Sequence, residues 1–136
     1  MQIFDGHLDL AMNAVMYNRD LTLSLARLRN YEKEIKAPRD EHNRSDGRGT
    51  ATVTFDELRR GQITHCTATI FTRAKPGATA LEGFLRSGDD SSSPTIAAAL
   101  AHAQLAYYQQ LHRSGRMRIL RQTEDFTPSP PHQLTL

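Results

Sequence analysis

IFDGHLD, residues 3–9, is the stretch of sequence that decides the fold. The apolar pair at its start favours an extended backbone, and Gly6 permits a sharp change of direction, so we expect a short strand that ends in a loop. Because side chains alternate along a strand with a period of two, His7 and Asp9 should point to the same side.

Helical and strand-like segments alternate beyond this stretch. Apolar residues at helical spacing predict helices, and a run of β-branched residues predicts a strand. The first expected element is a helix over residues 21–36, with Leu21, Leu25, Leu28 and Ile35 near one face, and a polar loop over 37–50 follows it. Next come a short helix from Thr54 to Gly61, a strand over 63–71 and a flexible stretch over 74–93. A helix from Ser93 to about Ser114 and a strand over 117–120 complete the expected order.

Local signals mark the ends of two of these helices. Thr54 and Glu57 match a capping box, and Gly61 suits a left-handed residue after the last turn. Ser93 followed by Pro94 is typical of a helix start. The long helix should stop at Gly115 and bury the stripe Ile96, Leu100, Ala103, Tyr107 and Leu111.

Strands that alternate with helices predict an α/β fold with a parallel sheet built from right-handed βαβ units. A sheet of only three parallel strands makes a poor self-sufficient fold, because parallel strands are normally buried on both faces. A (β/α)₈ barrel takes about 250 residues, so we interpret residues 1–126 as the N-terminal part, about three βα units, of a TIM-like metal-dependent hydrolase barrel. Residues 127–136 form a Pro-rich end that we expect to be non-homologous or disordered.

His7 and Asp9 are the residues with the strongest chemical signal. They stand at the carboxyl end of the first predicted strand, which is the edge where α/β barrels bind ligands. Imidazole nitrogen and carboxylate oxygen are both good zinc donors. Such a pair also arises by chance, so its weight depends on the surrounding sequence.

The surrounding sequence resembles the membrane (renal) dipeptidase family, zinc peptidases of the amidohydrolase superfamily. The similarity extends over about residues 2–126, with Leu8 and Ala11 departing from the more common Asn and Pro. The segments that carry it are residues 3–10 (IFDGHLDL), 18–23 (NRDLTL), 47–50 (GRGT), 57–61 (ELRRG), 103–108 (AQLAYY) and 116–121 (RMRILR).

The resemblance implies a site of two zinc ions, in which a metal-activated water attacks the carbonyl of a dipeptide substrate. His7 and Asp9 carry over as metal ligands, which gives half of a zinc site. The family's bridging Glu and two further His have no counterpart, and no catalytic or substrate-binding residue carries over. We therefore expect a truncated chain with little or no peptidase activity.

Other polar residues receive weaker functional interpretations. Glu124 and Asp125 are expected as first-turn helix residues rather than ligands. Asp5 shares the strand parity of His7 and Asp9 and is expected either as a third ligand or, preferably, as a support that accepts a hydrogen bond below the metal. Asn18 and Arg19 are candidates for the border of a substrate pocket. The remaining interpretations are structural: His65 and Cys66 buried in a strand, Tyr107 and Tyr108 packing, His102 and His112 on the surface, and His42 and His132 without a site signal.

Composition limits the partners and the location. Seventeen Lys and Arg oppose fifteen Asp and Glu, a balance of +2 that does not predict nucleic-acid binding. No signal peptide and no apolar run of about 20 residues is present, so we expect a cytoplasmic protein without a membrane segment. The alternative function is a non-catalytic α/β domain that binds a partner or forms a homo-oligomer through unfinished sheet edges. A metallohydrolase with a His-x-His pair is a third possibility that residues 7–9 do not match.

Overall fold

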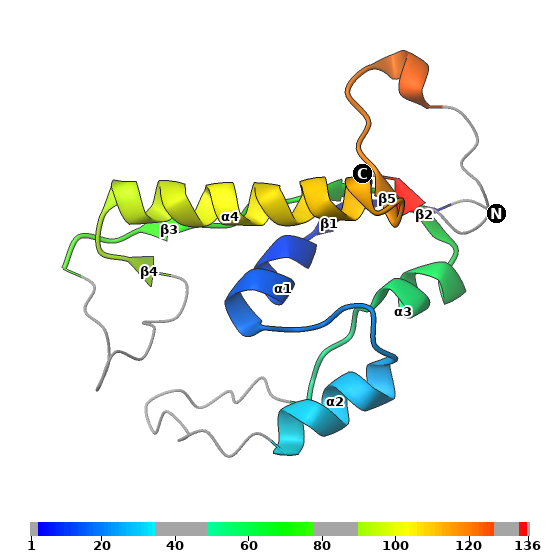
Figure 1. Cartoon of the computed structure of the whole chain (residues 1–136), viewed down its shortest axis with the longest axis horizontal. Coiled ribbons are helices and arrows are strands. Elements are labelled where there is room, and N and C mark those ends of the chain that lie inside the picture. The colour runs from blue at the N-terminus through cyan, green and yellow to red at the C-terminus, as the bar shows by residue number, and fades with distance from the viewer. Residues whose placement is uncertain (1–2, 35–48, 78–89, 127–133, 136) are drawn as a thin grey trace.

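The computed structural model describes residues 3–34, 49–77, 90–126 and 134–135 (Figure 1). The chain is a mixed α/β structure with parallel strands, which confirms the predicted class. The elements in chain order are β1 (Ile3–Leu8), α1 (Leu10–Tyr17), α2 (Leu25–Glu34), α3 (Phe55–Arg60), β2 (Ile63–Ala68), β3 (Arg73–Ala74), β4 (Asp90–Ser91), α4 (Pro94–Arg113), β5 (Met117–Arg118), the 3-10 turn η1 (Thr123–Asp125) and β6 (Leu134–Thr135).

The main sheet has four strands in the order β1-β2-β6-β5, and each neighbouring pair is parallel. Ile3 lies opposite Ile63 and Leu8 opposite Ala68, and the register of β1 against β2 shifts twice between these pairs, after Ile3 and between Asp5 and Leu8. β6 comes from the Pro-rich end and lies between β2 and β5, a position that the sequence did not predict. Outside this sheet, β3 and β4 pair in parallel within the stretch expected to be flexible.

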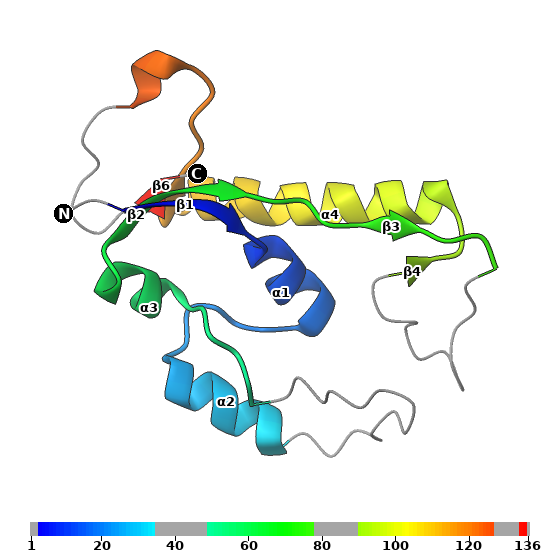
Figure 2. The same ribbon diagram turned by 180° about the vertical axis from the view of Figure 1, so that it is seen from behind.

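Helix α4 runs alongside the strands, and α1 lies between α4 and the lower helices α2 and α3 (Figures 1 and 2). One contiguous core joins these elements, because apolar residues of β1, α1, α3, β2, α4 and β5 meet there. Its buried members are Leu8, Leu10, Ala11, Leu21, Phe55, Leu58, Cys66, Tyr108, Leu111 and Met117.

The loop predicted after the first strand is wrong, because residues 10–17 form helix α1. This segment, LAMNAVMY, is apolar on nearly all sides and therefore shows no polar face at helical spacing. The burial of α1 explains this composition, because Leu10 and Ala11 are in the core and residues 12–16 are half-buried. The next helix is shorter than predicted, since α2 begins at Leu25 rather than at residue 21.

The capping predictions are partly confirmed. Thr54 Oγ1 accepts a hydrogen bond from the Glu57 amide at 3.3 Å, and Ser93 Oγ accepts one from the Ile96 amide at 3.3 Å. The Glu57 carboxylate, however, lies 2.9 Å from Arg60 instead of returning to Thr54. Gly61 is not left-handed: its φ is −74°, and the left-handed residue is Gln62 with φ 56°.

The buried stripe of α4 is shifted from the predicted one. Ile96 is 47% exposed, whereas Gln104 is completely buried. The Gln104 side chain accepts from the Phe71 amide at 2.9 Å and donates to the Phe71 carbonyl at 2.8 Å. These two hydrogen bonds satisfy the buried side-chain amide of Gln104, and they hold the face of α4 that carries Gln104 toward the interior. The residues buried on α4 are Ala97, Gln104, Tyr108 and Leu111.

Candidate metal centre

His7 and Asp9 lie together at the carboxyl end of β1. His7 is in the strand, and Asp9 is the residue that precedes α1. The imidazole Nε2 is 3.3 Å from each carboxylate oxygen of Asp9, which confirms that the two side chains share one side. The His7 side chain is 68% exposed and that of Asp9 is 28% exposed, so the pair is open to solvent on one side.

Neighbouring groups orient this pair. The Asp5 carboxylate accepts a hydrogen bond from the His7 backbone amide at 2.9 Å. This hydrogen bond holds the backbone of β1 at the residue that carries the imidazole. The hydroxyl of Thr69, just after β2, donates to Asp9 Oδ1. One carboxylate oxygen of Asp9 is thus held by Thr69, which follows the neighbouring strand, while the other oxygen contacts His7 Nε2.

Tyr108 of α4 ties together the two segments that flank the pair. Its hydroxyl donates to the Thr69 carbonyl at 2.8 Å and accepts from the Ala11 amide at 3.1 Å. Burial raises the pKa of Tyr108 to about 12, so the hydroxyl keeps its proton and its donor role. The sequence predicts only a packing role for Tyr108 and no role for Thr69. The Thr69 contact depends on the pairing of β1 with β2, and nothing local in the sequence signals it.

The 3.3 Å contact between His7 Nε2 and the Asp9 carboxylate is a hydrogen bond. Its length also matches two positions of one tetrahedral zinc ion, because two donors bonded to one zinc at about 2.0–2.1 Å are roughly 3.3 Å apart. The site is nevertheless incomplete within the described residues, since they contain no group of three or more His, Cys, Asp or Glu that could hold a metal. Asp5 therefore acts as a support, as expected, and not as a third ligand.

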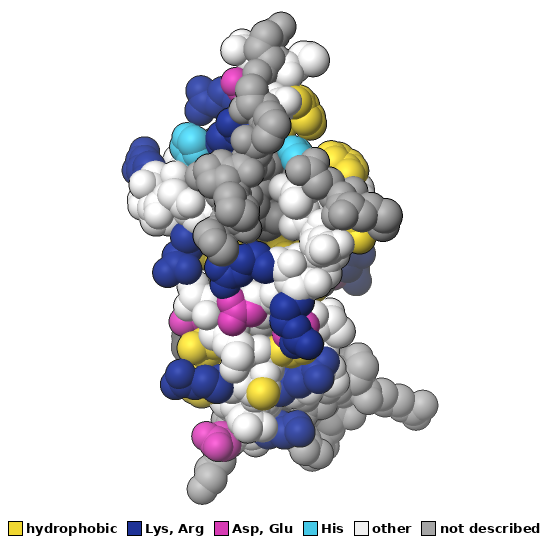
Figure 3. Space-filling model, turned by 90° about the vertical axis from the view of Figure 1, so that its right-hand side faces the viewer, with side chains coloured by type: hydrophobic (Ala, Val, Ile, Leu, Met, Phe, Trp, Pro, Cys, Tyr) yellow, Lys and Arg dark blue, Asp and Glu magenta, His cyan; other side chains and the backbone are white. Residues whose placement is uncertain are grey.

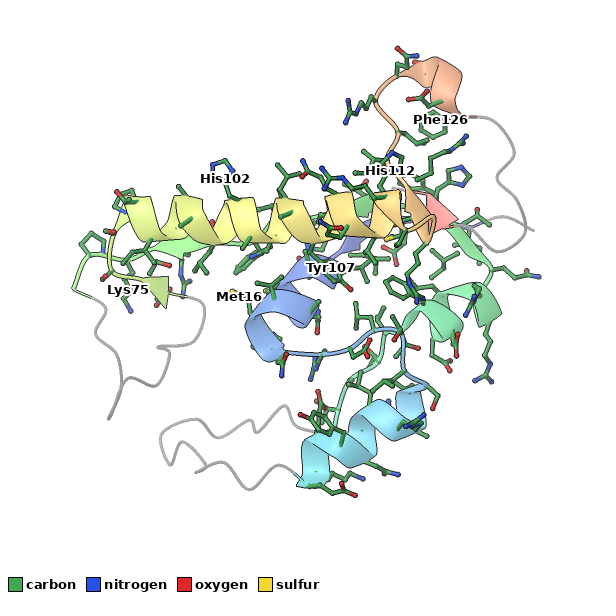
Figure 4. The ribbon with its side chains drawn as sticks, viewed as in Figure 1. Met16, Lys75, His102, Tyr107, His112 and Phe126 are labelled. Atoms are coloured by element: carbon green, nitrogen blue, oxygen red, sulfur yellow. The ribbon has the colours of Figure 1, made fainter. Side chains whose placement is uncertain are left out.

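The other candidates lie away from this pair. Asp125 caps η1, where its carboxylate accepts from the Arg121 amide at 2.8 Å and the Gln122 amide at 3.3 Å. His102 and His112 are exposed on α4, and the His102 ring points away from the body of the molecule in Figure 4. His42, His132 and the side chain of Glu124 lie outside the described part of the chain.

Arg19 takes part in a network of polar contacts between α1 and α2. Its guanidinium contacts Glu32 Oε1 at 2.5 Å and Asn13 Oδ1 at 2.6 Å, and it lies over the Tyr17 ring at 5.4 Å. Glu32 is buried and also accepts from the Gly49 amide at 2.6 Å. This network joins α1 to α2. Asn18 is the left-handed residue that ends α1.

Cys66 is a buried thiol in β2, as predicted. Burial, and secondarily the charge of Asp5, raises the pKa of Cys66 to about 12, so the thiolate that would bind a metal or act as a nucleophile is disfavoured. Cys66 is therefore inert at neutral pH.

Comparison with models of protein families, with curated proteins and with solved structures gives no match to this chain. The resemblance to the dipeptidase family accordingly stays a prediction, and so does the barrel. None of the helices within the described ranges is long and apolar enough to cross a bilayer. On the face shown in Figure 3, Lys and Arg side chains are interspersed with Asp and Glu rather than gathered in one patch.

Proposed function

We propose that this chain carries one half of a zinc dipeptidase site, formed by His7 and Asp9. The observation that carries the proposal is the separation of 3.3 Å between His7 Nε2 and the Asp9 carboxylate at the carboxyl end of a parallel strand. The support of Asp9 by Thr69 is the kind of second contact that metal ligands require. The family resemblance of the segments around the pair supplies the reaction class, hydrolysis of a dipeptide, and a place in a TIM-like barrel.

The proposal also specifies what the isolated chain does. Catalytic zinc sites usually have three protein ligands and one open position. Since the described residues supply two, zinc should bind weakly, and solvent should fill the remaining positions. We expect the isolated chain to turn over dipeptides slowly or not at all.

A hydrolysis assay tests this expectation. Purified protein is incubated with excess zinc and a panel of dipeptides, and release of free amino acids is followed. The expected rate is no greater than that of the His7→Ala variant under the same conditions. Turnover that depends on His7 and Asp9 would show that the site is complete in this chain, and would overturn the half-site account.

A second candidate function is self-association through the sheet. β1 is an edge strand of the main sheet among the described residues, so its outer backbone groups have no strand beside them. Sedimentation or light scattering over a range of concentrations distinguishes this role. A dimer that persists at low micromolar protein and is disrupted by Asp5→Pro would favour it, and a monomer throughout would exclude it.

A further inference from the structure

A pocket of about 500 Å³ lies beside the main sheet, apart from the His7–Asp9 pair. It is enclosed by residues of β1, β2 and α4 and by the segment that follows β5, and neither His7 nor Asp9 lines it. Pockets that take small organic molecules are about 300–1,000 Å³ and mostly apolar, with a few polar groups. The volume therefore suits a small ligand rather than a polypeptide segment.

The walls of the pocket are rich in aromatic and aliphatic side chains. Phe4 of β1 is 59% exposed and Phe126, after η1, is 58% exposed, so two large apolar rings face solvent at its edge. The His65 ring stacks parallel to Phe126, with centroids 5.8 Å apart and planes at 9°. Leu105 of α4 closes another side. Figure 4 places Phe126 beyond the C-terminal half of α4. A flat apolar ligand would remove this surface from water.

The charged residues that line the pocket indicate which polar group such a ligand would carry. Arg121 is the only permanently charged residue among the described residues that line it, and none of them is Asp or Glu. The segment that carries Arg121 is held by the Asp125 carboxylate, which accepts from the amides of Arg121 and Gln122. A guanidinium on a fixed backbone matches a carboxylate or a sulfonate, because it can donate two parallel hydrogen bonds to two oxygens of either group.

We propose that this pocket binds a small planar aromatic molecule that carries one carboxylate or sulfonate group. Its rings pack against Phe4, Phe126 and Leu105, and its anion pairs with Arg121. This inference concerns a second site and does not rest on zinc binding at His7 and Asp9.

Two dyes with related ring systems test the proposal by fluorescence titration. Anilinonaphthalene sulfonate carries the anion, and N-phenylnaphthylamine lacks it. The wild-type chain should bind one anionic dye per molecule at saturation. Arg121→Gln should weaken the anionic dye by about tenfold or more, the loss expected of one charge-assisted hydrogen bond, and should leave the neutral dye within about twofold. Phe126→Ala should weaken both dyes.

Matched variants outside the pocket serve as controls. Ile96→Ala removes an exposed apolar side chain of α4, and Arg60→Gln removes an exposed cation of α3. Neither should change either affinity, and circular dichroism should show that every variant keeps its helical content. Several dyes bound per chain, equal weakening by Ile96→Ala, or no effect of Arg121→Gln on the anionic dye would overturn the proposal. So would dye binding that disappears as a dimer forms, because a second copy would then cover the pocket.

Discussion

Thr69 is the residue whose role follows most directly from the structure. Its hydroxyl donates to Asp9 from the neighbouring strand, so Thr69→Val should leave Asp9 free to rotate and weaken zinc binding by about tenfold or more. The measurement is a zinc titration in parallel with Thr52→Val, an exposed threonine in the segment before α3. Equal affinity of the Thr69→Val and Thr52→Val variants would show that Thr69 does not orient a metal ligand.

Tyr108 should matter for stability through its hydroxyl. Tyr108→Phe leaves the Ala11 amide and the Thr69 carbonyl without this partner in a buried place. The expected loss is about 1–3 kcal/mol in the free energy of unfolding, measured by denaturant titration. Tyr107→Phe removes the same hydroxyl from the adjacent, half-buried tyrosine and should cost less. If the two variants lose the same stability, the bridging role of Tyr108 is wrong.

At the residue scale the sequence predicted that His7 and Asp9 lie on one side, but not what holds Asp9 in place. The two residues are two apart at the carboxyl end of β1, so their proximity follows from local geometry alone. Thr69 and Tyr108 follow Asp9 in the chain by 60 and 99 positions, respectively. Their contacts exist only because β2 pairs with β1 and α4 packs against α1, and no local pattern encodes that.

The turn between α3 and β2 offers a prediction at the scale of elements. Gln62 adopts a left-handed backbone with φ 56°, which costs a residue with a Cβ roughly 1–2 kcal/mol relative to the helical region. Gln62→Gly should therefore raise the free energy of unfolding by up to about 1 kcal/mol. This value allows for the larger conformational entropy that glycine loses on folding. Thermal denaturation measures the change. A variant less stable than wild type would mean that the Gln62 side chain contributes more than its backbone costs.

The sequence predicts a helix poorly where its apolar and polar residues do not lie on separate faces. α1 is apolar on nearly all sides and therefore gave no helical period. α4 gave a clear period, but its buried stripe is shifted from the predicted one and shares only Leu111 with it. The burial of Gln104 decided that face through two hydrogen bonds to Phe71. β5 lies at the start of the strand predicted over 117–120, whereas the two-residue strands β3, β4 and β6 are too short for composition to reveal.

The whole molecule should lose stability in alkaline solution. Burial raises the pKa of Cys66 from 9.0 to about 12, and that of Tyr107 and Tyr108 from 10.0 to about 12. The unfolded chain therefore releases these protons at lower pH than the folded chain does. The stabilisation is fully present below about pH 9 and is lost as the pH rises toward 12.

Denaturant titrations between pH 8 and 12 follow this loss. The free energy of unfolding should fall with increasing pH, and Cys66→Ala should make the fall between pH 9 and 12 shallower. Serine is unsuitable as the replacement because it buries a new polar group. A wild-type stability that is flat across this range would contradict the burial of these groups.

The central claim is that His7 and Asp9 together bind zinc as half of a site, and isothermal titration with zinc tests it most directly. The account predicts weak, saturable binding of one zinc ion per chain. His7→Ala and Asp9→Asn should each reduce the affinity by about tenfold or more, whereas His102→Ala on the exposed surface of α4 should not. Zinc binding that is absent from the wild-type chain, or equal in the His7→Ala and His102→Ala variants, would contradict the account.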